Sequence, residues 1–142
     1  PLRISAVSGN YYIALLHRNH LPVLTQQPVP LGMGLNAFDL TTGSTALHVP
    51  NAETQRNGRY LLWSGDVNGD ATVKYTGADN DRDPVLLTIG GTVPTNTVSG
   101  YLPADVNLDG TVKYTGIRND RDPILLTIGG TVPTAVRVQP LP

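Results

Sequence analysis

A duplicated segment constrains the fold of this chain more than any other feature of its sequence. Residues 66–95 and 105–134 align over 30 positions, begin 39 residues apart and differ at only five positions. Self-similarity at a fixed spacing indicates one structural unit used twice, with its copies packed against each other or a shared neighbour. The sequence therefore predicts a tandem-repeat region over residues 65–142, preceded by a separate region over residues 1–64.

Each copy of the repeat opens with the pattern D-x-N-x-D, which places side-chain oxygens at loop positions one, three and five, with a backbone carbonyl expected at position seven. These residues are Asp66, Asn68, Asp70 and Thr72 in the first copy and Asp105, Asn107, Asp109 and Thr111 in the second. Hard oxygen ligands at this spacing favour Ca²⁺, and Mg²⁺ fits less well because it keeps several waters. We expect two calcium sites. The alternative is that these Asp and Asn residues only form Asx turns.

The loops lack the acid that usually closes such a site, because position twelve is glycine in both copies. The next acids shared by the copies are Asp81, Asp83, Asp120 and Asp122. We expect Asp81 and Asp120 to close the loops and Asp83 and Asp122 to cap the following helix, and the reverse assignment stays open. Position six needs a positive φ, which Gly110 adopts freely and Ala71 only at a cost of about 1 kcal/mol. The first site is therefore expected to be the weaker one.

A short helix is predicted after each loop. The motif N-D-R-D-P offers an Asn or Asp oxygen as N-cap and acidic residues in the first turn, and it places proline where a helix tolerates it. The apolar residues 85–89 and 124–128 form the body, and paired glycines end it. Helices of two or three turns are unstable alone, so we expect them to pack against each other or against the N-terminal region.

The N-terminal region reads as β-structure. Strands are predicted at residues 4–7, 11–18, 23–32, 36–42 and 59–65, the third being irregular because of its prolines. Five strands fall short of the roughly seven of an immunoglobulin-like sandwich. Either upstream residues or a strand of another protomer completes the sheet, or a strand within residues 43–58 has been missed. The predicted fold class is mainly β with short helices: an incomplete immunoglobulin-like sandwich followed by duplicated calcium loop–helix units.

Composition limits the classes of function. Nine of the eleven acidic residues lie inside the two repeats, and the net charge is −1, which does not favour binding to nucleic acid. Cysteine is absent, no apolar segment is long enough to span a membrane, and no nucleophile elbow, P-loop or dinucleotide motif is present. We therefore expect a protein that is not an enzyme. The chain opens at Pro1 rather than at methionine, as expected of a processed or truncated product.

The run His17-Arg18-Asn19-His20 is the one candidate for transition-metal binding. On a continuous strand, a spacing of three places the two imidazoles on opposite faces, which disfavours chelation. We expect instead a turn at the end of a strand, held by side-chain hydrogen bonds.

The duplicated D-x-N-x-D-G-x-V-x-Y loop with its short helix resembles dockerin-type repeats. A closer similarity is to C-terminal modules of large secreted or surface proteins of Bacteroidota. It is carried by residues 8–21 (SGNYYIALLHRNHL) and 65–84 (GDVNGDATVKYTGADNDRDP), and it extends over nearly the whole chain. The resemblance implies an immunoglobulin-like β region joined to a dockerin-like calcium region, with an extracellular or bacterial cell-surface location. The loop departs from the dockerin pattern in its glycine at position twelve and in its insertion.

Two functions fit these observations. The first is a non-catalytic, calcium-stabilised structural module, a subunit of a bacterial surface filament or pilus-like assembly in which a strand of one protomer completes another. Its partners would be further copies of the chain. The second is a dockerin-like module whose two repeats offer equivalent faces for docking a partner protein or a carbohydrate.

Overall fold

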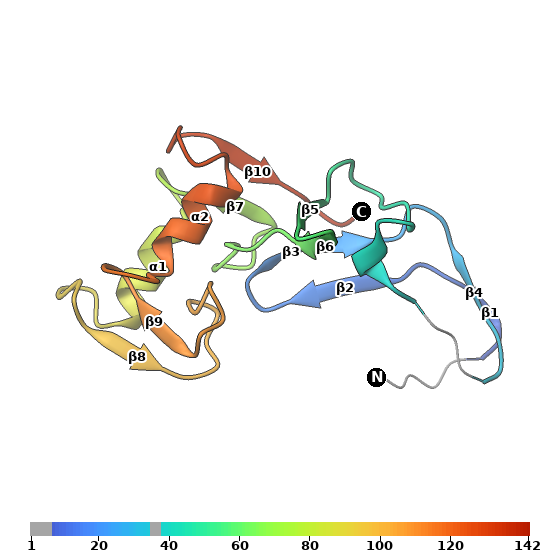
Figure 1. Ribbon diagram of the computed structural model, residues 1–142, viewed down its shortest axis with the longest axis horizontal. Coiled ribbons are helices and arrows are strands. Elements are labelled where there is room, and N and C mark those ends of the chain that lie inside the picture. The colour runs from blue at the N-terminus through green and yellow to red at the C-terminus, as the bar shows by residue number, and fades with distance from the viewer. Residues whose placement is uncertain (1–6, 35–37) are drawn as a thin grey trace.

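The computed structural model describes residues 7–34 and 38–142. These residues form a mainly β structure with two short α-helices and several two-stranded antiparallel sheets (Figure 1). The strands are β1 (Gly9–Tyr11), β2 (Ala14–His17), β3 (His20–Leu24), β4 (Val29–Leu31), β5 (Glu53–Arg56), β6 (Arg59–Leu62), β7 (Thr72–Lys74), β8 (Thr97–Ser99), β9 (Thr111–Lys113) and β10 (Val136–Val138). The helices are the 3-10 turn η1 (Leu40–Thr42), α1 (Arg82–Thr88) and α2 (Arg121–Thr127).

In the described part of the N-terminal region, the strands form three antiparallel pairs, β1–β4, β2–β3 and β5–β6. The predicted strand at 11–18 is interrupted after Tyr11 and resumes as β2, and the predicted strand at 23–32 divides into the end of β3 and β4. The alternative that a strand lies within residues 43–58 is confirmed, since β5 falls there. Because the described residues form only two-stranded sheets here, the immunoglobulin-like sandwich stays a prediction.

Two other strand predictions have different outcomes. The strand expected at 36–42 is wrong for the described residues 38–42, of which the last three form η1 because the Asp39 carboxylate accepts a hydrogen bond from the backbone N–H of Thr41. This is an Asx-type N-cap, which competes with extended structure. The strand expected at 4–7 lies almost entirely outside the described residues.

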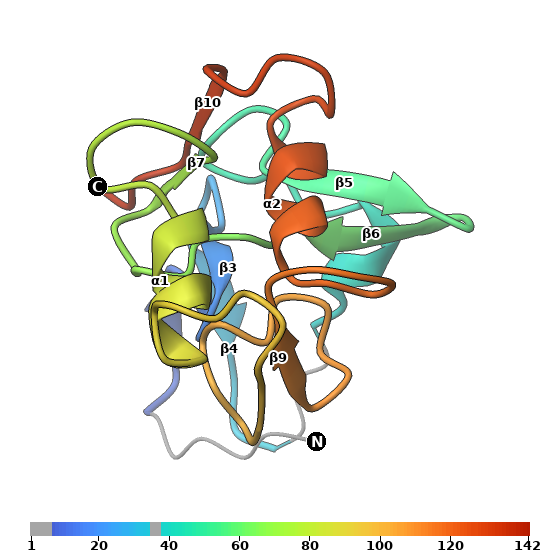
Figure 2. The same ribbon diagram turned by 90° about the vertical axis from the view of Figure 1, so that its left-hand side faces the viewer.

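The repeat region confirms both predicted helices, and it adds a short strand to each copy. The pairing crosses between the copies. Strand β7 of the first repeat pairs with β10, which follows the second repeat, whereas β9 of the second repeat pairs with β8, which follows the first. The helices also pack on the opposite copy, since α1 contacts β9 and α2 contacts β7. Figure 2 shows α1 and α2 side by side. Neither copy is therefore complete without the other.

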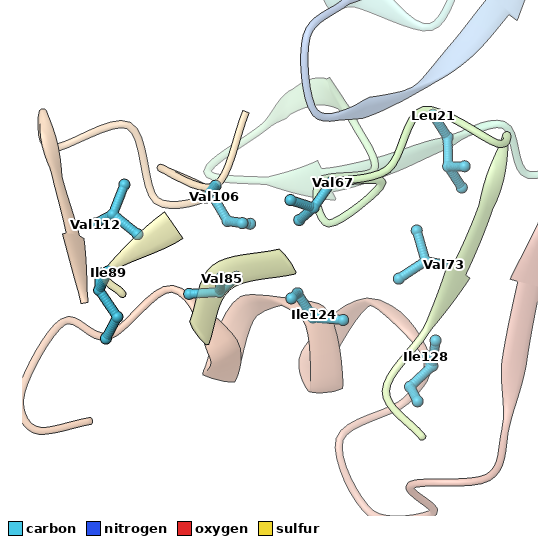
Figure 3. Packing of buried hydrophobic residues seen from close by; sticks show 10 residues of the cluster. Leu21, Val67, Val73, Val85, Ile89, Val106, Val112, Ile124 and Ile128 are labelled. Atoms are coloured by element: carbon cyan, nitrogen blue, oxygen red, sulfur yellow. The ribbon is translucent and has the colours of Figure 1, made fainter. Parts of the chain in front are cut away.

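One hydrophobic cluster joins the two copies (Figure 3). Val85 of α1 and Ile124 of α2 are fully buried in it, together with Val73 of β7 and Val112 of β9. Leu21 of β3 is also fully buried in this cluster, so the N-terminal region shares the core of the repeats.

The C-terminal residues return to the N-terminal region after β10 (Figure 1). Gln139 is almost fully buried there, and its side-chain amide donates to the carbonyls of Pro22 (2.7 Å) and Ala52 (3.2 Å). The two parts of the chain are thus joined at residues far apart in sequence. Within the described ranges, no helix has the length and apolar character needed to cross a membrane.

Candidate functional site

The first loop is organised around Asp66. Its Oδ1 accepts the backbone N–H of Asp70 (3.0 Å) and its Oδ2 that of Ala71 (3.1 Å). The Asn68 Oδ1 also accepts from Asp70 N (3.0 Å), and the Asp70 Oδ1 accepts from Thr72 N (2.8 Å). The second loop repeats these bonds from Asp105, Asn107 and Asp109 at nearly the same distances.

The carboxylate of Asp81 binds backbone N–H groups of the first loop and of β7. Asp81 is fully buried, and its Oδ1 accepts the N–H groups of Val67 (2.7 Å) and Asn68 (3.3 Å). Its Oδ2 accepts the N–H of Lys74 (2.8 Å), so the carboxylate connects the start of the loop to β7. Asp120 makes the same three bonds in the second loop.

Burial of these carboxylates perturbs their ionisation. Desolvation raises the pKa of Asp81 from 3.8 to about 6, against the lowering effect of its three N–H donors, and the neighbouring charge of Asp66 raises it further. Desolvation likewise raises the pKa of Asp120 and of Asp66. Burial of these neighbouring acids therefore disfavours their charged forms.

Asp83 and Asp122 lie in the first turn of the helices. The capping oxygen comes from Asn80, whose Oδ1 accepts the N–H of Asp83 (2.9 Å), while the Asn80 amide donates back to the Asp83 carboxylate (2.8 Å). Asn119 and Asp122 make the same reciprocal pair. The side chains of Asp83 and Asp122 are 55% and 60% exposed. Of the Asn or Asp oxygens predicted to cap the helices, those of Asn80 and Asn119 accept the helix N–H groups, whereas the Asp83 and Asp122 carboxylates accept from the Asn amides instead.

The backbone removes the predicted reason for a weaker first site. Position six does adopt a positive φ, 61° at Ala71 and 83° at Gly110. Position four does so too, and here the first loop has Gly69 (76°) and the second has Leu108 (63°). Each loop thus holds one non-glycine residue in the left-handed region, so the two costs of about 1 kcal/mol offset each other.

The Arg18–Asn19 turn between β2 and β3 contacts the second loop, and no feature of the sequence pointed to this contact. Arg18 donates from Nε to the Leu102 carbonyl (3.0 Å) and from Nη2 to the Asp105 Oδ2 (3.3 Å), and its guanidinium stacks 3.6 Å from the centre of the Tyr101 ring. In the described residues, no Lys or Arg forms an ion pair with Asp66. The two loops therefore differ in charge environment rather than in backbone strain.

The histidine run forms the expected turn, so the argument from opposite faces does not apply, because it assumed a continuous strand. His17 ends β2 and His20 begins β3, so the two residues are cross-strand partners in a hairpin. Their rings meet edge to face with centroids 4.4 Å apart, and the His20 Nδ1 lies 2.8 Å from the Asn19 Oδ1. Across residues 7–34 and 38–142, no cluster of three or more His, Cys, Asp or Glu is placed to hold a metal ion.

The donor chemistry of the two loops suits a calcium ion. They offer only oxygens, from Asp, Asn and the backbone, which suits a hard cation. The Ala71 carbonyl at position six accepts from Gln139 N (2.9 Å), so it is used by the pairing with β10. Beside the acids, Asn68 and the Thr72 carbonyl would be the further oxygen donors to such a cation.

A scan against protein-family models, a search of curated proteins and a search of solved structures found no match for this chain. What the residues 7–34 and 38–142 define is a mainly β protein with two short helices and two Asp-rich loops.

Proposed function

We propose that this chain is a non-catalytic structural module, rigidified by two calcium ions, that assembles with further copies of itself by β-strand addition. The carrying observation is the pair of loops in which a buried carboxylate, Asp81 or Asp120, gathers backbone N–H groups around the Asp-x-Asn-x-Asp oxygens.

One calcium ion would be held by Asp66, Asn68, Asp70 and the Thr72 carbonyl, while the buried Asp81 carboxylate keeps the loop backbone in place. The matching residues of the second loop would hold the other ion. The ions would bring positive charge to these acids, of which Asp105 alone has an ion-paired arginine in the described residues. Loops of this kind in extracellular modules bind at about 10⁻⁴ to 10⁻³ M, a range that suits calcium levels outside cells. An extracellular or cell-surface location belongs to the same proposal.

The outer edge of β2 supports strand addition. In the described residues β2 pairs only with β3, and Leu15 and Leu16 on β2 are 41% and 69% exposed. An open strand edge with exposed leucines is a template for pairing with another chain.

Sedimentation velocity tests both parts of the proposal, in millimolar CaCl₂ and in excess chelator. We expect larger species in calcium than in chelator, and we expect Leu16→Lys to abolish them because a charged side chain blocks an edge strand. Leu87→Lys is the matched control, since Leu87 on α1 is also 69% exposed and far from β2 in sequence. A monomer in both buffers would exclude assembly, and absence of calcium binding by titration calorimetry would exclude the calcium sites.

A specific observation also favours dockerin-like docking. Leu87 and Leu126 occupy the same position in the two helices and are 69% and 68% exposed. Two equivalent apolar side chains on adjacent helices would give a partner two alternative docking orientations. Capture by an immobilised cohesin domain in calcium, lost on Leu87→Lys with Leu126→Lys but kept in Leu16→Lys, would support this function over self-assembly.

A further inference from the structure

The turn between β2 and β3 holds the starts of both repeats. Asn19 is fully buried, and its side-chain amide donates to the carbonyls of Pro103 (2.9 Å) and Asp105 (2.7 Å). Its own carbonyl accepts the N–H of Gly65 (2.8 Å), the residue before Asp66. One side chain and its backbone therefore fix the first residue of the second loop and the approach to the first.

All hydrogen-bonding groups of the Asn19 side chain are used. Both amide hydrogens have carbonyl acceptors in the second repeat, and the Oδ1 pairs with the His20 Nδ1 (2.8 Å). Buried polar groups that are fully satisfied specify one arrangement, because any shift leaves a buried donor or acceptor without a partner. The adjoining Arg18 adds its bonds to Leu102 and Asp105.

The same turn ends the strand that carries the open edge. β3 is anchored on its far side, where Leu21 N donates to the Trp63 carbonyl (2.8 Å) and its side chain is buried in the repeat cluster. Within residues 7–34 and 38–142, β2 pairs with β3 alone, and three of its four residues are exposed. The order of β2 thus depends on a turn whose position is set by the two loops.

We propose that the Arg18–Asn19 turn couples the two Asp-rich loops to the β2 edge, so that ordering of the loops orders β2. This coupling rests on the proposed function in one respect, namely that calcium is what orders the loops. Its consequence is that β2 becomes a defined pairing edge only when the loops are ordered, which would make assembly respond to calcium at a distance from the cation sites.

Amide hydrogen exchange of the full chain tests the coupling, with CaCl₂ or chelator, in the wild type, Asn19→Ala and Asn57→Ala. Asn57 is a matched control because it lies in the two-residue turn of the β5–β6 hairpin and is exposed. In the wild type and in Asn57→Ala, we expect calcium to slow exchange in both loops and, by about fivefold or more, in β2. In Asn19→Ala, we expect the loops to respond and β2 not to respond.

A β2 strand that ignores calcium in the wild type while the loops respond would overturn the coupling, and so would an Asn19→Ala variant that transmits the change in full. If neither loop responds to calcium in any variant, the calcium proposal fails instead. The coupling is then decided by Asp120→Ala, which loosens the second loop directly. Faster exchange in β2 of that variant supports the coupling, and unchanged exchange overturns it.

Discussion

The crossed packing of the repeats predicts the effect of Ile124→Ala. Ile124 on α2 is fully buried, and α2 packs on β7 of the other repeat (Figure 3). The substitution deletes three carbons, which at about 0.8 kcal/mol each, plus the cavity left behind, gives a loss of about 3–4 kcal/mol of unfolding free energy. With a urea slope of about 2 kcal/mol/M, the midpoint should fall by about 1.5–2 M.

Leu126→Ala, two residues further along the same helix, is the matched control. Leu126 is 68% exposed, so its loss should cost less than about 1 kcal/mol. Hydrogen exchange of Ile124→Ala should show lost protection in β7 of the first repeat as well as in α2. Loss confined to residues 105–134, or equal effects of the two substitutions, would refute the reasoning that each repeat completes the other.

Three further predictions follow from single residues. Gly65→Ala should destabilise the fold by about 2–3 kcal/mol, because φ is +114° and a Cβ would lie 3.2 Å from two atoms of the core. Ala104→Gly, at the matching position of the second copy, should cost about 1 kcal/mol. Equal urea midpoints of the two variants would contradict this prediction. Burial lowers the pKa of His20 from 6.5 to about 4, so its neutral form stabilises the fold fully above pH 6.5 and the contribution is lost as the pH falls toward 4. Discounted for the partial exposure of the ring, the loss of unfolding free energy is roughly 1–2 kcal/mol. The urea midpoint of His20→Gln should not fall in this way between pH 6.5 and pH 4. Arg18→Gln should raise the calcium affinity of the second loop about tenfold by removing the cation beside Asp105, and unchanged titration calorimetry would count against it.

The sequence predicted the local structure of the repeats well because local chemistry determines it. The Asn80 cap, the acidic first turn and the glycine pair after each helix act within a few residues, and α1 and α2 lie where these signals place them. The positive φ at position six was predictable for the same reason. The role of position four at Leu108 was missed, since a leucine gives no sign that its backbone is left-handed.

Long-range features could not be read from the chain. The partner of β7 lies more than 60 residues away in β10, and neither strand carries a signal that selects the other over β8 or β9. The contact between Arg18 and Asp105 spans 87 residues and depends on where the β2–β3 turn falls. The same turn places His17 and His20 on facing strands, where the alternation of side chains along one continuous strand does not apply.

The residues after each helix show how one unit serves two different neighbours. Gly100 and Gln139 occupy the same position in the two copies, and each donates its backbone N–H to position six of the opposite loop, at Gly110 (3.1 Å) and Ala71 (2.9 Å). Backbone pairing of this kind needs no particular side chain, which explains why β8 and β10 have different sequences but the same role. The side chain is free to specialise, and in Gln139 it reaches the buried carbonyls of the N-terminal region, a contact that glycine cannot make. The segment after the second copy thereby contacts the N-terminal region at Pro22 and Ala52, whereas the segment after the first copy connects to the second copy.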